Sequence, residues 1–442
     1  MDERFDVVIV GARCAGSPLA TLLGRQDVRV ALVDQDAFPS DALSTHFFEA
    51  DALAFLARLG VDDQLRATRA PFITRTDNRL EDIRWSTDWP QVEGDIGGLA
   101  SVRRIVLDQL LVEAAQEAGA ELYAGSGVTD LVRDQTNRVA GVRLNTSAGE
   151  RELSARLVIG ADGRTSTVAR LAGARQYNLT PNQRATYWSY FEGAAIGEPT
   201  FVFHRWADRF VVAAPCDSGL YEVQVMPDLA DLDAFRGDVS GSFMAHAMSC
   251  EPVAEAIASA TRVGKVLGMV RWSGFFREPA GRGWVLVGDA GLFKDPAAGR
   301  GIGDAFEQAE SLAATIVGAL RGSDAELDTT LKHWGRRRDE AFAEYYWFGT
   351  DLGAGGRVPV VLPELVRGLQ AGGKSHLMLE IQSRRARPSR VLSPPRVVAA
   401  VARALLRRGG ERGRLLRELA QLGSQQARRV WLKHRPAFAT DD

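Results

Sequence analysis

The chain opens with a hydrophobic pattern typical of a buried parallel β-strand followed by a helix. Asp6 to Val10 (DVVIV) is an apolar, β-branched run, and a glycine-containing turn follows it directly. Residues 15–26 then fit a helix, and residues 29–33 (RVALV) form a second apolar run that ends at Asp34. This order predicts a βαβ unit that binds a nucleotide, because a strand, a turn, a helix, a second strand and an acidic residue follow one another within about thirty residues.

The turn of this unit, Gly11 to Gly16 (GARCAG), departs from the GxGxxG pattern at its middle glycine. Gly11 permits a tight turn, Gly16 lets the helix and strand pack closely, and the helix N-terminus faces a pyrophosphate. We expect the guanidinium of Arg13, which replaces the middle glycine, to line the pyrophosphate. The alternative is a degraded fingerprint without a ligand. The cofactor-binding residues predicted here are Gly11, Ala12, Arg13, Cys14, Ala15, Gly16 and Asp34.

Two later strands also run into glycine and aspartate. Residues 156–159 predict a short strand that leads into Asp162-Gly163, where the aspartate alone could equally be a helix N-cap. Residues 284–287 (WVLV) predict a strand that delivers Gly288 and Asp289 to its carboxyl end, where ligands of open α/β sheets gather. Pro296 then breaks the chain, and a helix begins near Gly303 with its N-terminus able to stabilise negative charge.

Together these segments resemble the three signatures of the group A FAD monooxygenases, the para-hydroxybenzoate hydroxylase-like family. The signatures are the glycine fingerprint, the DG motif at Asp162, and the GD motif within Gly288 to Ala305 (GDAGLFKDPAAGRGIGDA). The resemblance spans residues 5–350 and implies a Rossmann-like α/β FAD-binding domain of the GR2 type. It implies noncovalent FAD as cofactor, with NADPH or NADH as the reductant. The further cofactor-binding residues that it implies are Arg104, Val128, Asp162, Gly288, Asp289, Pro296, Gly301, Ile302 and Gly303.

The resemblance also assigns roles to some of these residues. Asp289 would accept hydrogen bonds from the ribityl hydroxyls, and the backbone amides of Gly301 to Gly303 would meet the flavin pyrimidine edge. Leu292 and Gly303 stand where many members carry histidine and asparagine. Lys294-Asp295-Pro296 is similar to a divergent oxidoreductase branch with geranylgeranyl reductase-like and halogenase-like relatives.

The activity that the resemblance implies is hydroxylation or epoxidation of an apolar or aromatic small molecule with NAD(P)H and O2, through a flavin C4a-hydroperoxide. Two alternatives keep the fold and change the reaction: a reductase or dehydrogenase of the geranylgeranyl reductase type, or a halogenase. A third is a flavoprotein without catalysis. His46 is the candidate catalytic residue, as a general base or flavin contact, and the competing interpretation is a hydrogen-bonded core histidine.

The domain organisation follows from where strand patterns interrupt this framework. Residues 183–227 alternate like strands of a mixed sheet, and their aromatic side chains favour an apolar or aromatic substrate. We expect a discontinuous FAD-binding domain, an inserted β-sheet substrate domain and a C-terminal helical appendage. The expected boundaries are 1–70, 100–175 and 265–350 for the FAD-binding domain, 71–99 and 176–264 for the substrate domain, and 351–442 for the basic helical region.

Composition fits a large enzyme without metal or membrane segments. The chain has 442 residues, 45% of them hydrophobic, and a formal net charge of −2. Its three widely spaced cysteines indicate neither a disulfide framework nor a zinc site, so we expect a cytoplasmic protein with no bound metal. No signal peptide or transmembrane run is expected, and no nucleic-acid partner. The arginine-rich region after Arg357 predicts helices packed on the FAD domain, with a membrane-surface or nucleic-acid element as the alternative.

Overall fold

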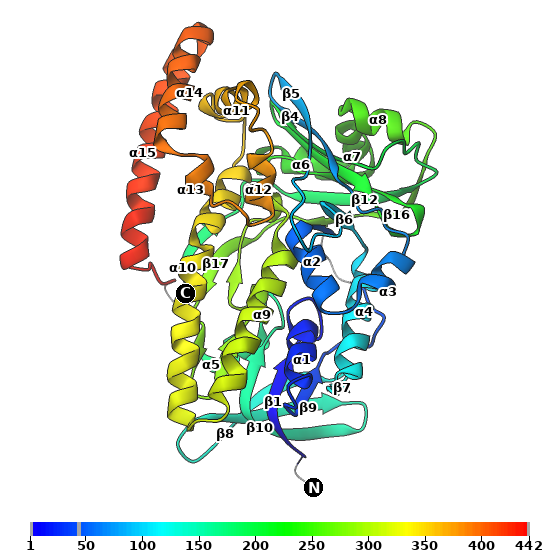
Figure 1. Ribbon diagram of the computed structural model, residues 1–442, viewed down its shortest axis with the longest axis vertical. Helices are drawn as coiled ribbons and strands as arrows, with labels where there is room; N and C mark the ends of the chain where they lie inside the picture. The colour runs from blue at the N-terminus through cyan, green and yellow to red at the C-terminus, as the bar shows by residue number, and fades with distance from the viewer. Residues whose placement is uncertain (1–2, 42–45, 440–442) are drawn as a thin grey trace.

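The computed structural model describes residues 3–41 and 46–439. An eight-stranded sheet, here called the central sheet, lies in the lower half of Figure 1. The strand order is β18-β19-β10-β1-β2-β7, and the β8–β9 hairpin extends the sheet by pairing with β10. The strands from β19 to β7 run parallel, whereas β18 and β9 pair antiparallel with their neighbours. Their bounds are β1 Glu3–Val10, β2 Val30–Val33, β7 Glu121–Tyr123, β8 Gly127–Arg133, β9 Val139–Thr146, β10 Gly149–Gly160, β18 Ala280–Gly281 and β19 Trp284–Leu286.

Helices α1, α4 and α9 cover one face of this sheet, and strand β9 with the short helix α5 covers the other. One buried apolar cluster joins β1 and β2 to the helices, which bury residues such as Leu19, Leu111 and Ile316. A second cluster on the opposite face joins β1 and β10 to β9 and α5. The helices concerned are α1 Gly16–Gly24, α4 Arg104–Glu117, α5 Thr167–Ala172 and α9 Gly301–Ala319. The β1-α1-β2 order confirms the predicted βαβ unit.

A seven-stranded sheet forms the second layer of the molecule. Its order is β16-β12-β15-β14-β13-β4-β5, and only the β13–β4 pair is parallel. One face packs on α6 Leu232–Gly237, α7 Val239–Met248 and α8 Glu251–Ile257. The strands are β4 Arg75–Leu80, β5 Ile83–Asp88, β12 Thr186–Glu192, β13 Thr200–Trp206, β14 Arg209–Pro215, β15 Tyr221–Val225 and β16 Thr261–Met269.

Shorter elements join the two large sheets. One small sheet pairs β3 Phe47–Glu49 with β6 Leu99–Ser101. Strand β3 leads directly into α2 Ala50–Arg58, which α3 Asp62–Ala67 follows. The other has the order β11-β17-β20, with β11 Gln176–Pro181, β17 Ser273–Arg277 and β20 Leu292–Phe293. The predicted fold class, an α/β protein with a Rossmann-like sheet and a further mixed sheet, is confirmed.

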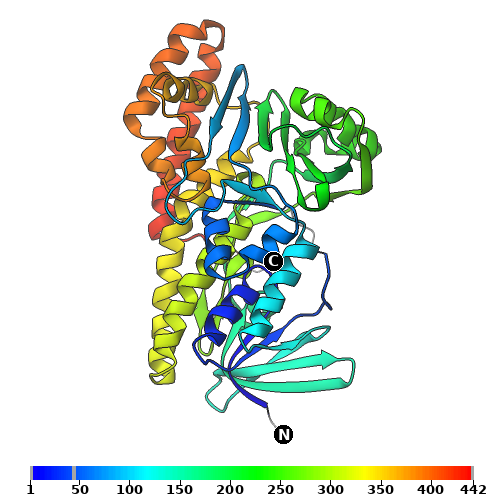
Figure 2. The same ribbon diagram turned by 45° about the vertical axis from the view of Figure 1, so that its right-hand side comes forward.

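Helices make up the C-terminal part of the chain. The long helix α10, Asp324–Leu352, runs beside the central layer, and the later helices stack at its upper end (Figures 1 and 2). A buried apolar cluster that includes Tyr345, Leu365 and Leu415 holds them together. They are α11 Val361–Ala371, α12 Leu377–Gln382, α13 Pro388–Val391, α14 Pro394–Arg407 and α15 Arg412–His434. No helix in the described parts of the chain is long and apolar enough to cross a membrane.

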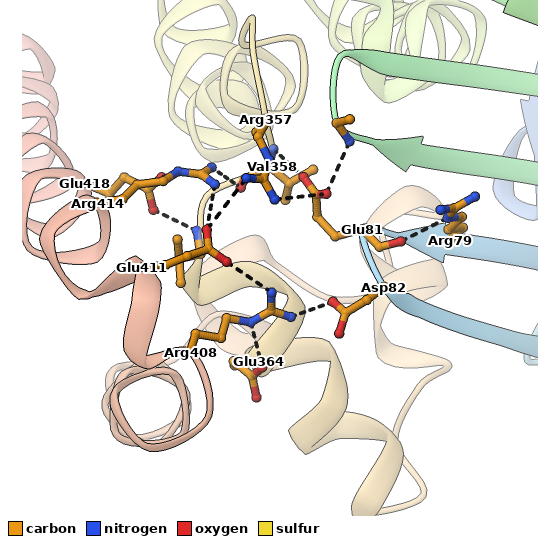
Figure 3. Close-up of polar contacts among 12 residues, drawn as sticks. Arg79, Glu81, Asp82, Arg357, Val358, Glu364, Arg408, Glu411, Arg414 and Glu418 are labelled. Atoms are coloured by element: carbon orange, nitrogen blue, oxygen red, sulfur yellow. Dashed lines mark hydrogen bonds and ion pairs between the residues drawn. The ribbon is translucent and has the colours of Figure 1, made fainter. Parts of the chain in front are cut away.

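Many C-terminal arginines pair with carboxylates of the protein itself. In both views the β4–β5 hairpin stands between the C-terminal helices and α6–α8, and its tip carries Glu81 and Asp82 (Figures 1 and 2). Arg408 donates to Asp82 at 2.5 Å and to the buried Glu364 at 3.0 Å (Figure 3). Arg414 donates to the carbonyl of Val358 at 2.6 Å, so the hairpin, α11 and α15 meet in one polar network.

This network predicts a stability effect at Arg408. We expect Arg408→Ala to lower the free energy of unfolding by about 1–3 kcal/mol, because the buried carboxylate of Glu364 loses a charged donor. Urea unfolding followed by tryptophan fluorescence measures the change. The control Arg428→Ala removes an exposed arginine of α15 and should change stability by less than about 0.5 kcal/mol. Equal unfolding midpoints for the two variants would contradict the proposed role of the network.

Candidate functional site

A cavity of about 420 Å³ lies at the carboxyl ends of β1, β2 and β10 and against the start of α9. Many of the residues predicted from the sequence line it, although they come from segments almost three hundred residues apart. The lining residues among them are Gly11, Arg13, Cys14, Ala15, Asp34, Arg104, Val128, Asp162, Asp289, Pro296, Gly301 and Ile302. Ala12, Gly16, His46, Gly288 and Gly303 lie outside this lining.

The glycine turn after β1 is held by backbone contacts that exclude a side chain. Gly11 has φ +104°, and a Cβ built on it would lie 2.4 Å from the carbonyl oxygen of Ala161. A Cβ on Gly16 would lie 1.8 Å from the carbonyl oxygen of Gly11. The amide of Ala12 donates to the Asp34 carboxylate at 2.7 Å, so the acid that ends β2 also fixes the turn. Ala12 and Gly16 therefore do not line the cavity, but their contacts fix the turn that does.

Arg13 is held by carboxylates at the edge of the cavity. Its guanidinium donates to Asp108 and to Asp36, each at 2.7 Å, and to Ser40 Oγ at 2.9 Å. These contacts compete with the pyrophosphate contact expected from the sequence. Arg13 therefore links the glycine turn to α4 in addition to lining the cavity.

Arg104 and Arg13 both donate to the carboxylate of Asp108. The Arg104 guanidinium donates to both oxygens of Asp108 at 3.0 Å, and Asp108 is fully buried. Cys14 Sγ lies 3.4 Å from the same carboxylate, and burial raises the pKa of this thiol above its ordinary range. The neighbouring Arg103, whose side chain is 30% exposed, pairs with the buried Asp217 at 2.8 Å.

The two aspartates of the later motifs have different surroundings. The Asp162 carboxylate accepts from Ser166 Oγ at 2.5 Å and from the Thr167 amide at 2.7 Å, so it fixes the start of α5. Asp289 lies in a short 3₁₀ turn, Gly288–Ala290, and its side chain accepts no hydrogen bond from the described residues. Burial raises the pKa of Asp289 to about 6, against the opposing charge of Arg104. A ligand that donates hydrogen bonds would therefore stabilise the Asp289 carboxylate.

An ionic cluster, defined here as Glu49, Lys294, Arg300 and Asp304, underlies the start of α9. Arg300 pairs with Glu49 at 3.0 Å, and Lys294 pairs with Asp304. All four side chains are at least nine-tenths buried. Burial raises the pKa of Glu49 to about 8 and lowers that of Lys294. Within this cluster Lys294 and Asp304 line the cavity.

Gly303 makes room for this cluster. A Cβ on Gly303 would lie 2.9 Å from Arg300 Nη2, so a side chain there would displace the guanidinium. Arg300 also pairs with Asp51 of α2 at 2.7 Å. The missing side chain at Gly303 thus leaves space for the Arg300 guanidinium beneath the cavity, a role that the sequence motif did not indicate.

The wall beyond α9 is largely apolar. Phe47, Trp188, Met269, Leu292 and Phe293 line it. Strand alternation explains the position of Trp188, because it and Thr186 face the cavity while Tyr187 and Phe191 pack toward α6–α8. The other aromatic residues noted in the sequence, including Phe201 and Phe210, are core residues between the layers.

His46 is buried next to this wall, and its ring contacts Tyr190 of β12. The imidazole Nε2 is hydrogen-bonded to the Tyr190 hydroxyl, and the two rings are nearly parallel with centroids 5.7 Å apart. Residues 42–45, which precede His46, lie outside the described residues.

Some cavity residues were absent from the sequence prediction. Arg164, Lys294, Asp295 and Asp304 line the cavity, as do Trp188 and Ser126. Lys294 could have been singled out from the sequence, since it departs from the hydroxylase pattern within the GD motif. The pairing of Arg300 with Glu49 could not, because the two residues are 251 positions apart and local patterns do not relate them.

Comparison with known proteins agrees with this geometry. Residues 4–204 match the family model described as FAD binding domain. A probable electron transfer flavoprotein-quinone oxidoreductase of Escherichia coli is 31% identical over 180 residues, which are 39% of each chain. A tryptophan 2-halogenase of Chondromyces crocatus is 24% identical over 72% of this chain and 62% of its own length. A digeranylgeranylglycerophospholipid reductase of Methanococcoides burtonii is 23% identical, over 75% of this chain and 80% of the reductase. The chain thus spans less than two thirds of the first two relatives.

Solved structures share the fold at low sequence identity. A flavoprotein/dehydrogenase from Cytophaga hutchinsonii superimposes with a TM-score of 0.75 at 18% identity, covering 92% of this chain and all of that one. Aklavinone-11 hydroxylase, solved with FAD and aklavinone, has a TM-score of 0.64 at 20% identity and covers 80% of this chain and 69% of its own.

The residues present fit FAD. The Asp289 carboxylate faces the cavity without a donor from the described residues, and the Gly11 turn leaves no space for a side chain beside Ala161. The cavity extends from Asp34, Ser126 and Val128 to Gly301 and Ile302, as a ligand with two separated ring systems requires. Residues 4–204 therefore match an FAD-binding domain, and the chain has the fold shared by solved flavin-dependent halogenases and aklavinone-11 hydroxylase.

Proposed function

We propose that the protein is an FAD-dependent monooxygenase that uses NAD(P)H and O2 to hydroxylate or epoxidise an apolar or aromatic small molecule. The observation that carries the proposal is the continuity of one cavity from the glycine turn to an apolar wall. Asp34 lies at one end of this cavity, and Phe47, Trp188 and Phe293 lie at the other. The relationship to aklavinone-11 hydroxylase, which was solved with its aromatic ligand, supports an aromatic substrate.

In this proposal the cofactor is held by the discontinuous domain of residues 1–70, 100–175 and 265–350. The adenosine part would lie near Asp34 and Val128, and the pyrophosphate near the start of α1. Asp289 would accept hydrogen bonds from the ribityl hydroxyls, and the amides of Gly301 and Ile302 would meet the flavin ring at the N-terminus of α9. When bound, FAD supplies the hydride acceptance and oxygen activation that protein side chains lack.

The side chains of this chain would bind, orient and exclude water. The apolar wall of Phe47, Trp188, Met269 and Phe293 would desolvate the substrate, together with strands from residues 71–99 and 176–264. His46 Nε2 and the Tyr190 hydroxyl would share one proton through their hydrogen bond. Hydroxylation balances as substrate, O2, NAD(P)H and a proton giving hydroxylated substrate, water and NAD(P)+.

Two alternative reactions use the same cofactor site. The similarity to a digeranylgeranylglycerophospholipid reductase supports reduction of an isoprenoid double bond. The similarity to a tryptophan 2-halogenase over 72% of the chain supports halogenation. Lys294, a buried cation on the cavity wall, departs from the usual hydroxylase pattern and keeps both alternatives open.

The cofactor assignment predicts an effect of Asp289 on FAD retention. We expect Asp289→Ala to weaken FAD binding by about 10–100-fold, since a buried charged acceptor contributes about 1.5–3 kcal/mol to its hydrogen bonds. Titration of the FAD-free protein with FAD, followed by flavin fluorescence, measures the dissociation constant. His46→Ala should weaken binding less, and the exposed Asp63→Ala should not change it. A larger loss in His46→Ala than in Asp289→Ala would mean that the cofactor lies elsewhere.

The reaction assignment predicts coupled consumption of NAD(P)H and O2. The protein is reduced anaerobically by NADPH or NADH with candidate phenols and polycyclic aromatics, and O2 is then admitted. The proposal expects a substrate-dependent product that gains one oxygen atom, measured by mass spectrometry with ¹⁸O2. A product that gains two hydrogens without oxygen uptake would establish the reductase instead, and a halide-dependent halogenated product would establish the halogenase.

A further inference from the structure

A second cavity, distinct from the cofactor cavity, lies among α9, α10 and the turn after α12. Its volume is about 530 Å³, and we call it the arginine pocket. Four of its lining residues are arginines, and only one is a carboxylate. It is lined by Glu307, Ala341, Tyr345, Arg384, Arg385, Arg387, Ser389 and Arg390.

Arg384 is the buried centre of this pocket. Its side chain is 9% exposed, and its Cζ lies 4.0 Å from the ring centroids of both Phe342 and Tyr345. Nη2 donates to Glu307 at 2.8 Å, but Nη1 is buried and has no hydrogen-bond partner among the described residues. Because Nη1 is closed off from solvent, Arg384 contributes its positive charge to the pocket and not a free N–H.

The backbone at Arg384 is also held in an unfavourable conformation. Its φ is +58°, in the left-handed region that residues with a Cβ seldom adopt. The amides of Arg385 and Ala386 both donate to the carbonyl of Glu380, at 2.8 and 3.0 Å, and close the turn after α12. This turn brings four arginines within seven residues to one pocket.

The other arginines divide into anchored and available groups. Arg385 is anchored, because it pairs with Asp95 and donates to the carbonyl of Pro90 at 2.6 Å. Arg387 is 76% exposed, and its contact with Glu344 is 4.0 Å long. Arg390 is exposed, and no ion pair within the described chain involves it. The pocket therefore offers the exposed guanidinium groups of Arg387 and Arg390, beside the buried charge of Arg384, to a ligand with several acceptor oxygens.

The arginine pocket adjoins the cofactor cavity. Glu307 lines the pocket, and Asp304 and Ala305, less than one turn earlier in α9, line the cofactor cavity. Burial opposes the ionisation of Asp304, but the cations of Lys294 and Arg384 hold the pKa of this carboxyl below its ordinary value. Arg384 therefore lies close enough to act electrostatically on the buried pair beside the cofactor site.

From this geometry we infer that the arginine pocket binds the phosphate group of an organic phosphate. A phosphate offers three acceptor oxygens and up to two negative charges, which match the available guanidinium groups better than a carboxylate does. Two ligands of the proposed reaction could carry it: the 2′-phosphate of NADPH, or a phosphate ester on the substrate. The NADPH assignment rests on the proposed reductant, whereas the phosphate site itself does not.

Binding without turnover tests the site. Isothermal titration of the FAD-loaded protein with adenosine 2′,5′-bisphosphate and with inorganic pyrophosphate measures affinity for the phosphate alone. We expect Arg387→Ala/Arg390→Ala to weaken binding of both probes at least about tenfold, because charge-assisted hydrogen bonds are lost. Both residues are exposed, so the variant should fold, and its melting temperature verifies this. Arg407→Ala/Arg428→Ala is the matched control, since it removes two exposed arginines, from α14 and α15, that do not line the pocket.

Three outcomes are decisive. Equal probe affinities in the wild type, the double variant and the control would overturn the site, whatever reaction the enzyme performs. Weakened probe binding together with a raised KM for NADPH, but not for NADH, would assign the pocket to the 2′-phosphate. Weakened probe binding with both KM values unchanged would support the phosphate site, exclude NADPH and leave a phosphorylated substrate. Arg387→Lys/Arg390→Lys should recover part of the affinity, because the charge returns without the bidentate geometry.

Discussion

The cofactor cavity depends on how closely three backbone segments approach one another at the end of the central sheet. The turn after β1 lies against the end of β10, where a Cβ on Gly11 would meet the carbonyl of Ala161 at 2.4 Å. The start of α1 in turn lies against Gly11, because Gly16 has no side chain to separate them. Since β19 continues the same parallel sheet beside β10, Asp289 is delivered to this edge. The site is therefore a consequence of strand order combined with glycine at the points of contact.

The start of α9 shows a second constraint, which is the burial of charge. Glu49, Lys294, Arg300 and Asp304 are buried together, and removing Arg300 would leave Glu49 without its ion-pair partner, as removing Asp304 would leave Lys294 without its own. Glu49 ends β3 and Arg300 begins α9, so the cluster joins the small β3–β6 sheet to the helix that borders the cavity. The cluster thus fixes the position of the α9 N-terminus relative to the rest of the wall.

Local sequence patterns were sufficient for the parts of the fold that repeat a known geometry. The β1-α1-β2 unit, the strand before Asp289 and the helix after Pro296 each follow from apolar runs bounded by glycine, aspartate or proline. The contacts of Arg13 could not be predicted in this way, because its partner Asp108 is 95 residues away on α4. The same holds for the C-terminal region, where the partners of Arg408 lie on the β4–β5 hairpin and on α11. A basic segment in a sequence indicates charge, but only the fold reveals which carboxylates neutralise it.

Charge is distributed differently on the two sides of α9, and this bears on the kind of ligand that each cavity accepts. Lys294 faces the cofactor cavity but is paired with Asp304, so the pair adds little net charge beside the apolar wall. An ionised substrate group would gain little there and would lose its hydration, whereas an apolar or aromatic group would be favoured. On the other side of α9, the lining of the arginine pocket has a net positive charge, because its arginines outnumber its carboxylates.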